Sequence, residues 1–241
     1  ILASMFQLSR LSESWHYVVP VEADEIIYAT TFGDPAINWE QDQGQLSSEI
    51  VDGVMRLQVD LQNDGLYSAV DHYFTDFDVS VDTRAVGGVE NNGYGLVFRQ
   101  QDRQNYFMFL ISSDGYYRVV RIVDNQSRVL SDWHNGFDEP VLETGLNITH
   151  RIRVVGVDDQ FRFYINDELV PVCLPDDPDA LSTIDPRNGN CLEGQWQETL
   201  VDDSISYGRL GVTVITDGIP AGPVVEFDNV LVFGVDTLPQ D

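Results

Sequence analysis

Aromatic and arginine side chains crowd the segment Tyr94–Val123, which reads as three strands joined by two short polar turns. The residues Asp114-Gly115 predict a tight hairpin turn, and alternate residues of a strand point to opposite faces. Tyrosine rings can stack on a sugar ring, and guanidinium groups offer forked hydrogen-bond donors. We therefore predict that one face of this hairpin binds a ligand. The predicted binding residues are Arg99, Tyr106, Tyr117 and Arg121.

The opposite face of the hairpin is bulkier and more apolar, so we assign it to the core and place Arg118 at its rim. The tyrosine face has two other interpretations: it docks a protein, because Tyr, Met and Arg are enriched in interfaces, or another segment covers it. Trp133, in "SDWHNGF", is predicted in a loop, as a ligand contact or as an anchor packed on the domain. The residues assigned to the core are Phe107, Phe109, Ile111, Tyr116, Arg118 and Val120.

Short β-branched and aromatic runs bounded by turn signals predict ten or more strands and no long helix. Such a pattern is typical of a sandwich or barrel. We expect an N-terminal segment over 1–24, one all-β domain over 25–236 and a tail over 237–241. The main predicted strands are 25–32, 55–62, 77–86, 94–100, 105–112, 116–123, 150–157, 161–169, 207–216 and 224–235.

The charge is strongly acidic, with 40 Asp and Glu against 13 basic residues, all of them arginine, and a net charge of −27. Nucleic acids and anionic membrane surfaces need clustered cations on their partners, so the composition argues against both. An acidic solvated surface, life in salt and the binding of divalent cations all fit this charge.

Two cysteines, Cys173 and Cys191, bracket a loop rich in Pro, Asp, Asn and Gly. A disulfide that closes this loop would stabilise the fold by about 3 kcal/mol and would indicate an oxidising compartment; the alternative is two unrelated free thiols. The triplets at Asn125 and Asn147 match the N-glycosylation sequon. These features predict an extracellular or cell-surface protein.

The first fifteen residues, "ILASMFQLSRLSESW", carry apolar side chains at a helix-like spacing. We interpret them as the end of a membrane anchor or signal segment, or as a docking helix; a short helix packed on its own domain is the alternative. The sequence holds no run of eighteen apolar residues, so any membrane contact is expected only through this segment.

Several motifs follow one another in a fixed order: "FGDP", "YGLVFR", "DRQNYFMFLISSDGYYRVVR", "HRIRVVGVDDQFRFYINDELV", "GRLGVTV" and "VEFDNVLVF". In this order they resemble the concanavalin A-like lectin/glucanase superfamily, and within it the laminin-G-like jelly-roll modules of secreted or membrane-anchored bacterial proteins. The resemblance covers Ile26–Val235. It implies a jelly-roll β-sandwich of two antiparallel sheets, preceded here by a short helical or extended segment, with a concave sheet that often holds carbohydrate.

The same resemblance raises the question of catalysis, because its glucanase branch carries Glu-x-Asp-x-x-Glu on one strand. Glu226-Phe227-Asp228 is the nearest match, but Leu231 stands where the second Glu should be. The sequence also holds no Gly-x-Ser-x-Gly elbow, and its four histidines are scattered. We therefore predict a protein that is not an enzyme; a glycoside hydrolase with a carboxylate pair drawn from different strands is the alternative.

The resemblance also implies a structural Ca²⁺, held by groups of the first and last strands. Asp34 in "FGDP" and Asp228 in "EFDN" stand in the matching strands, and carboxylate oxygens suit this cation. A weaker alternative is the cluster Asp176, Asp177 and Asp179. The sequence thus predicts a binding or assembly module at a cell surface, whose partner is a carbohydrate or another protein of a surface complex.

Overall fold

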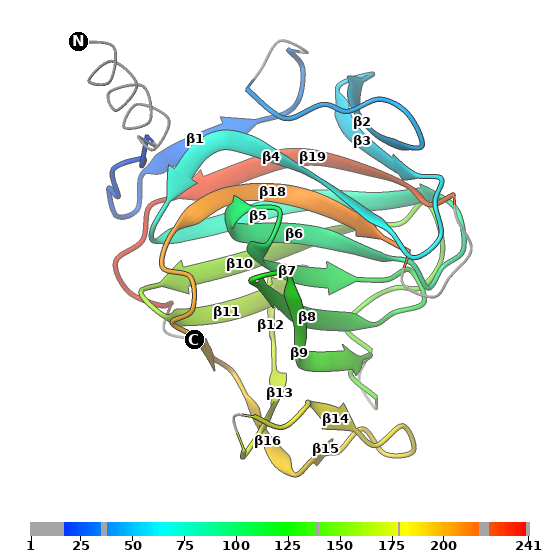
Figure 1. Cartoon of the computed structure of the whole chain (residues 1–241), viewed down its shortest axis with the longest axis vertical. Coiled ribbons are helices and arrows are strands. Elements are labelled where there is room, and N and C mark those ends of the chain that lie inside the picture. The colour runs from blue at the N-terminus through cyan, green and yellow to red at the C-terminus, as the bar shows by residue number, and fades with distance from the viewer. Residues whose placement is uncertain (1–16, 35–37, 138–139, 178, 217–221, 240–241) are drawn as a thin grey trace, which may run out of the picture.

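The computed structural model describes residues 17–34, 38–137, 140–177, 179–216 and 222–239, and within them it contains strands and turns but no helix. Two antiparallel sheets are stacked as a sandwich (Figure 1). The described part of the chain is therefore all-β, as predicted. No helix long and apolar enough to cross a membrane occurs in these residues.

The smaller of the two stacked sheets has six strands in the order β4-β18-β6-β7-β8-β9. Their inward-facing residues are apolar and their outward-facing residues are mixed, which is the pattern of a sheet with one buried face. The bounds are β4 (Gly65–Phe74), β18 (Gly208–Ile215), β6 (Gly93–Asp102), β7 (Asn105–Ile111), β8 (Tyr117–Val123) and β9 (Gln126–His134).

The larger sheet has nine strands, with the path β12-β11-β10-β5-β19-β3-β2; β1 pairs with β19, and β17 pairs with β11. The bounds are β1 (Ile26–Thr30), β2 (Leu46–Val51), β3 (Val54–Val59), β5 (Phe77–Gly87), β10 (Thr149–Val157), β11 (Gln160–Ile165), β12 (Glu168–Val170), β17 (Leu200–Val201) and β19 (Val224–Phe233).

Phenylalanine rings from both sheets meet in the core. Phe98 stacks on Phe107 with the ring centroids 5.2 Å apart, and Phe109 lies 4.9 Å from Phe163 of the other sheet. Each of these four rings is fully buried. Such large buried rings supply most of the apolar area that holds two sheets together.

The faces of β7 are as predicted, but those of β8 are reversed. Phe107, Phe109 and Ile111 lie in the core. The turn, however, spans Ser112–Tyr116, so that Ile111 pairs with Tyr117. A shift of one residue moves every side chain of a strand to the other face. Tyr117 therefore points into the core, and Arg118 and Val120 point outward.

An arm formed by residues 172–197 projects from one end of the sandwich (Figure 1). It contains β13 (Val172–Pro175) paired with β16 (Gly194–Gln197), and β14 (Thr183–Ile184) paired with β15 (Cys191–Leu192). The predicted disulfide Cys173–Cys191 is present in it. The arm lies against the edge strand β9, where Cys173 N donates to Ser131 Oγ and Asp132 N donates to Ser182 Oγ.

The predicted N-terminal segment 1–24 is described only from Tyr17 onward. There it follows the sandwich: Val18 forms a bridge with Tyr73 of β4, and Ala23 forms one with Gly234. Residues 1–15, to which the anchoring or docking role was assigned, lie outside the described residues, so that role stays a prediction.

Candidate functional site

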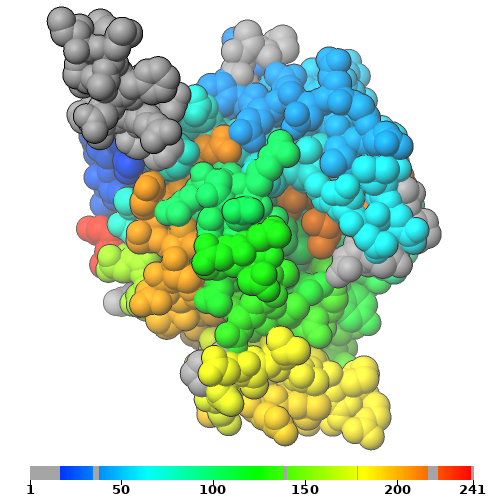
Figure 2. All heavy atoms as spheres, in the orientation of Figure 1, coloured from blue at the N-terminus to red at the C-terminus, as the bar shows by residue number. Residues whose placement is uncertain are grey.

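The outer face of the six-stranded sheet is hollowed into a groove of about 1120 Å³. Figure 2 shows this hollow between the segments coloured blue to cyan and those coloured green. Outward-facing residues of β4, β18, β6, β7 and β8 form its floor, and the loop Glu40–Gln43 forms one wall. The turns that hold Asp64 and Arg103 complete the rim. We call this hollow the groove.

Two tyrosines lie on an apolar floor. Val97, Met108 and Val120 belong to a second apolar cluster, separate from the core, and Tyr67 and Tyr106 pack against it. The two tyrosine rings are 5.7 Å apart and inclined at 55°. They give the groove an aromatic surface on which the apolar face of a sugar ring can stack.

Two glycines on the floor side of this sheet allow close packing of its strands. The strand register places Gly211 of β18 and Gly95 of β6 on the outer face, between β4 and β7. A Cβ at Gly211 would lie 2.4 Å from Ser68 O, so this position requires glycine for close strand packing. On the same face, the Tyr67 ring lies close to Tyr106, and its hydroxyl reaches Gln100.

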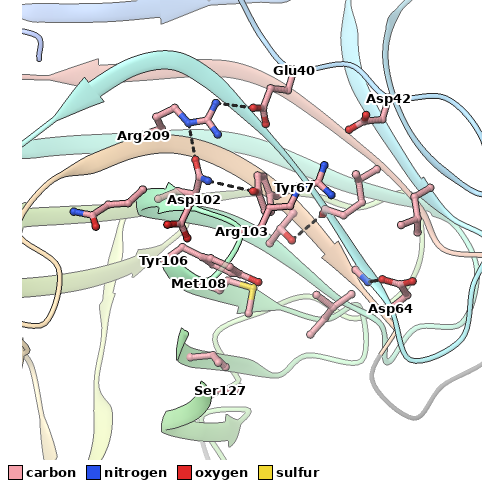
Figure 3. Close-up of a pocket in the computed structure, with 18 of the residues that line it drawn as sticks. Glu40, Asp42, Asp64, Tyr67, Asp102, Arg103, Tyr106, Met108, Ser127 and Arg209 are labelled. Atoms are coloured by element: carbon pink, nitrogen blue, oxygen red, sulfur yellow. Dashed lines mark hydrogen bonds and ion pairs between the residues drawn. The ribbon is translucent and has the colours of Figure 1, made fainter. Parts of the chain in front are cut away.

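A chain of four polar side chains crosses the groove (Figure 3). Arg209 donates from Nη1 to Glu40 Oε1 at 2.6 Å and from Nε to Gln100 Oε1 at 2.6 Å. The amide nitrogen of Gln100 then donates to Tyr67 Oη at 3.1 Å. Since the Tyr67 oxygen already accepts this bond, its hydroxyl hydrogen is available for an acceptor in the groove.

Burial and the nearby Glu40 carboxylate raise the pKa of Tyr67 above its ordinary value, and burial also raises the pKa of Tyr106. Both hydroxyls therefore remain protonated at every physiological pH. A protonated Tyr67 is a hydrogen-bond donor, which matches the orientation that Gln100 imposes on it.

The wall of the groove is held to the edge of β4. Glu40 N donates to Ala69 O, and the hydroxyl of Ser68 donates to Glu40 O at 2.6 Å. Trp39, the residue before it, forms a bridge with Val70 and is buried. These contacts fix the backbone of Glu40, so the carboxylate that receives Arg209 stands on a rigid support.

Tyr106 is the one predicted ligand residue that lines the groove. Arg118, which was assigned to the rim of the core, also lines it, and its guanidinium lies 5.5 Å from the centre of the Trp133 ring. Trp133 is not in a loop as predicted; it belongs to β9 and packs half-buried against the second apolar cluster.

The structure places the other three residues predicted on this face, Arg99, Tyr117 and Arg121, away from the groove. Tyr117 is 0% exposed, because of the register of β8, and its hydroxyl donates to Pro171 O. Arg99 is 1% exposed: β6 carries an irregularity here, Arg99 has φ = 53°, and its guanidinium lies over the core rings of Phe77 and Phe161. Arg121 is paired with Asp202 at 2.6 Å, away from the groove.

Sequence reasoning missed Glu40, Tyr67, Gln100 and Arg209. The alternation along β4 places Tyr67 outward, and that signal was available in the sequence. Nothing local indicates that Arg209 meets a carboxylate 169 positions earlier in the chain, because this contact depends on how β4 and β18 pair.

The carboxylates that line the groove are Glu40, Asp42, Asp64 and Asp102, and all four belong to its rim. Asp64 accepts a hydrogen bond from Gly65 N, and Asp102 accepts bonds from Gln104 N and the Asn105 side chain. Glu40 is engaged by Arg209. Each of these contacts fixes a carboxylate at the border of the groove.

The predicted calcium ligands lie elsewhere. Asp34 is exposed, and Asp228 accepts a hydrogen bond from Asn229 N at an irregular point of β19. The described part of the chain shows no group of three or more His, Cys, Asp or Glu side chains placed to hold a metal ion. The sequon residues Asn125 and Asn147 lie on exposed turns, and their glycosylation stays a prediction.

No protein-family model and no curated protein matches the sequence. The structure is similar to the carbohydrate-binding module CBM66 from Bacillus subtilis, with a TM-score of 0.54 at 14% identity over 89% of this chain and 99% of that one. A protein of unknown function with a galectin-like fold, from the same species, gives a TM-score of 0.56 at 10% identity, over 89% and 98%.

A GH43 protein from Bacillus licheniformis matches with a TM-score of 0.55 at 14% identity over 86% of this chain but only 39% of its own length. Identities this low establish the fold alone. The stacked antiparallel sheets and these likenesses together show that the chain has a concanavalin A-like jelly-roll fold.

Proposed function

We infer that this chain is a non-catalytic carbohydrate-binding module whose ligand lies in the groove. The observation that carries the proposal is the pair Tyr67 and Tyr106, which lie 5.7 Å apart on an apolar floor and are bordered by fixed hydrogen-bonding groups. Sugars offer an apolar ring face and a rim of hydroxyls, so they need both features at once. The likeness to CBM66 is consistent with this function.

The polar chain gives the ligand a defined set of partners. Tyr67 presents a hydroxyl hydrogen, while Glu40 and Asp42 present acceptor oxygens from the wall. Because Arg209 and Gln100 hold Tyr67 and Glu40 in place before binding, little ordering is needed when a ligand arrives. Preorganised groups of this kind favour the recognition of one hydroxyl pattern.

The contacts that already occupy two of the groove carboxylates support binding rather than hydrolysis. Retaining hydrolysis uses two carboxyl groups about 5–5.5 Å apart and inverting hydrolysis two that are about 6.5–9.5 Å apart, one of them serving as a proton donor. In the groove, Glu40 is already bound to Arg209, and Asp102 binds its own turn. A sugar-acting enzyme is the second candidate, favoured by the four carboxylates that line the same groove.

The disulfide in the arm supports export to an oxidising compartment. We propose an extracellular or cell-surface location. Docking on a protein of a surface complex, the other reading of the tyrosine face, would use the same groove and becomes an outcome of the binding test.

The test is calorimetric titration of the purified chain with a panel of soluble oligosaccharides and polysaccharides. Replacing Tyr106 by alanine should weaken binding by about 1–3 kcal/mol, or roughly 5- to 150-fold. The matched control is Tyr116→Ala, which removes an exposed tyrosine from the turn next to β8 and should leave the affinity unchanged. Equal affinity of wild type and Tyr106→Ala would refute the groove as the binding site.

Catalysis is tested on the same panel by the release of reducing ends. The expected result is none. Turnover that disappears in Glu40→Gln, Asp42→Asn, Asp64→Asn or Asp102→Asn, but not in Asp203→Asn on another part of the surface, would establish the enzyme instead.

A further inference from the structure

The rim of the groove is negatively charged on several sides. Glu40 and Asp42 stand on the wall, Asp64 on the turn between β3 and β4, and Asp102 at the end of β6, as Figure 3 shows. A ligand on the tyrosine floor is therefore approached by carboxylates from different directions. Their charges add within the groove, because each lies at its border.

The arginines that line the groove offset part of this charge. Arg209 is bound to Glu40, and Arg103 and Arg118 also line the groove, so the four carboxylates and three guanidinium groups leave one net negative charge there. Elsewhere most arginines are joined to carboxylates of the protein itself. At least nine of the thirteen form such ion pairs: Arg56, Arg84, Arg99, Arg121, Arg151, Arg153, Arg162, Arg187 and Arg209.

Because most arginines are paired with carboxylates of the protein, the carboxylates without such a partner determine the electric field around the molecule. The chain has a net charge of −27, and it has no lysine. Like charges repel over about one Debye length, roughly 8 Å at physiological ionic strength. An acidic sugar in the groove would meet both the rim carboxylates and the field of the whole molecule, whereas a neutral sugar would meet neither penalty.

We propose that the groove accepts neutral glycans and rejects acidic ones, such as polymers that contain uronic acids. This inference rests on the carbohydrate-binding function proposed above and adds the class of ligand. Repulsion at the rim is a form of specificity that excludes competitors without strengthening the contact with the correct ligand.

The experiment compares one polymer in three chemical forms. A neutral polysaccharide that binds in the panel is oxidised at its primary hydroxyls to carboxylates, and part of the product is converted to the methyl ester. At low salt, we expect the carboxylate form to bind more weakly by about tenfold or more. The ester, which has a similar shape but no charge, should recover most of the affinity, and added salt should narrow the gap for the carboxylate form alone.

Two variants localise the effect. Asp64→Asn combined with Asp102→Asn removes two rim charges, at residues that are given no contact with the ligand. It should reduce the difference between the carboxylate and ester forms several-fold, without changing the affinity for the neutral polymer by a comparable factor. Asp203→Asn removes one charge at the second, smaller hollow, away from the groove, and should change the difference little. If the two variants have equal effects, the groove rim is not the origin of the selectivity.

The remaining outcomes distinguish a failure of the charge selectivity from a failure of the proposed carbohydrate binding. If only acidic glycans of the panel bind, or if the carboxylate form binds as well as the ester, the charge selectivity is overturned while carbohydrate binding stands. If an oxidised polymer fails to bind in its ester form too, the loss is due to the altered hydroxyl and the inference fails. If no glycan of either kind binds, the proposed function and this inference fall together.

Discussion

Arg209 donates a hydrogen bond of 2.6 Å to Glu40, although the two residues stand 169 positions apart in the chain. Arg209 belongs to the floor of the groove and Glu40 to its wall. The same guanidinium donates to Gln100, which donates to Tyr67. The orientation of the Tyr67 hydroxyl is therefore set by a charged pair that also joins the wall to the sheet.

Tyr67→Phe tests this chain of hydrogen bonds. The ring and its stacking surface remain, and only the hydroxyl is lost, so ligand affinity should fall by about 1 kcal/mol, or roughly fivefold. Titration with the best ligand of the panel measures the change. Tyr116→Phe, on an exposed turn, is the control. An unchanged affinity in Tyr67→Phe would show that the hydroxyl does not contact the ligand.

Tyr106→Ala and Tyr117→Ala should separate the two faces of the sheet. Tyr106 lines the groove, so its loss should reduce binding with a modest effect on stability. Tyr117 is fully buried between the sheets, and its loss should lower the free energy of unfolding by about 3–5 kcal/mol. Denaturant titration and ligand titration of both variants give the comparison. Similar destabilisation by the two changes would contradict the assignment of the faces.

Tyr106 and Tyr117 also show which side-chain orientations can be predicted from the sequence. Alternation predicts both faces of β7, because they depend on that strand alone. The faces of β8 depend on the turn before it. Asp114-Gly115 resembles a two-residue turn, yet the chain takes the longer loop Ser112–Tyr116, which reverses the register. An error of one residue in the register is enough to place Tyr117 on the outer face and Arg118 on the core face, the reverse of the structure.

The outward orientation predicted for the Arg99 side chain differs from the structure for a related reason. Its place in an alternating run points it outward, but it has a left-handed φ of 53° beside an irregularity of β6, and its side chain turns to the core rings. The disulfide could be predicted from the composition of the loop between the two cysteines, and the sandwich from the spacing of the strands. The wall of the groove was not, since Glu40 meets β4 and β18 only after the sheet has formed.

Removal of the disulfide by Cys173→Ser with Cys191→Ser should lower the free energy of unfolding by about 3 kcal/mol, because the loop of the arm regains its freedom in the unfolded chain. Denaturant unfolding of the variant and of the reduced wild type measures the loss. Ser182→Ala is the matched control: it removes the bond from Asp132 N of β9 to the arm and the bond from Ser182 to Cys173 O within the arm, but it keeps the cross-link. It should lower the free energy of unfolding by about 1 kcal/mol. Free alkylation of both thiols without reductant would contradict the pairing.

His150 should make stability depend on pH. Burial lowers the pKa of this imidazole below its ordinary value of about 6.5. The ring lies 3.0 Å from the carbonyl of Glu143, so its Nε2 donates and its Nδ1 accepts from Asn166. The unfolded chain then binds a proton at a higher pH than the folded one. Stability is therefore full above about pH 6.5 and is lost as the pH falls toward the folded-state pKa.

Thermal unfolding from pH 7.5 to pH 5 measures this dependence, and His150→Gln should flatten it. His134 contributes in the same direction, since burial also lowers its pKa. Glu226 affects stability in a separate, more acid pH range. Burial opposes its ionisation, but bonds from Arg84 and Arg56 outweigh this effect and lower its pKa below 4.5, so its contribution is lost only at more acid pH. A slope in His150→Gln equal to that of the wild type would refute the role of His150.

Calcium binding by Asp34 and Asp228 is tested by chelation. β1 ends at Thr30, opposite Val230, so the chain leaves β1 toward the irregular part of β19 that holds Asp228. If the two carboxylates share a Ca²⁺, a chelator should lower the melting temperature at fixed ionic strength, because a ligand bound only by the folded state stabilises it by mass action. Asp228→Asn should melt at the chelated wild-type temperature and should no longer respond to chelator, while Asp203→Asn should respond as the wild type does. A wild-type melting temperature that is the same with and without chelator would exclude a stabilising calcium ion at these residues.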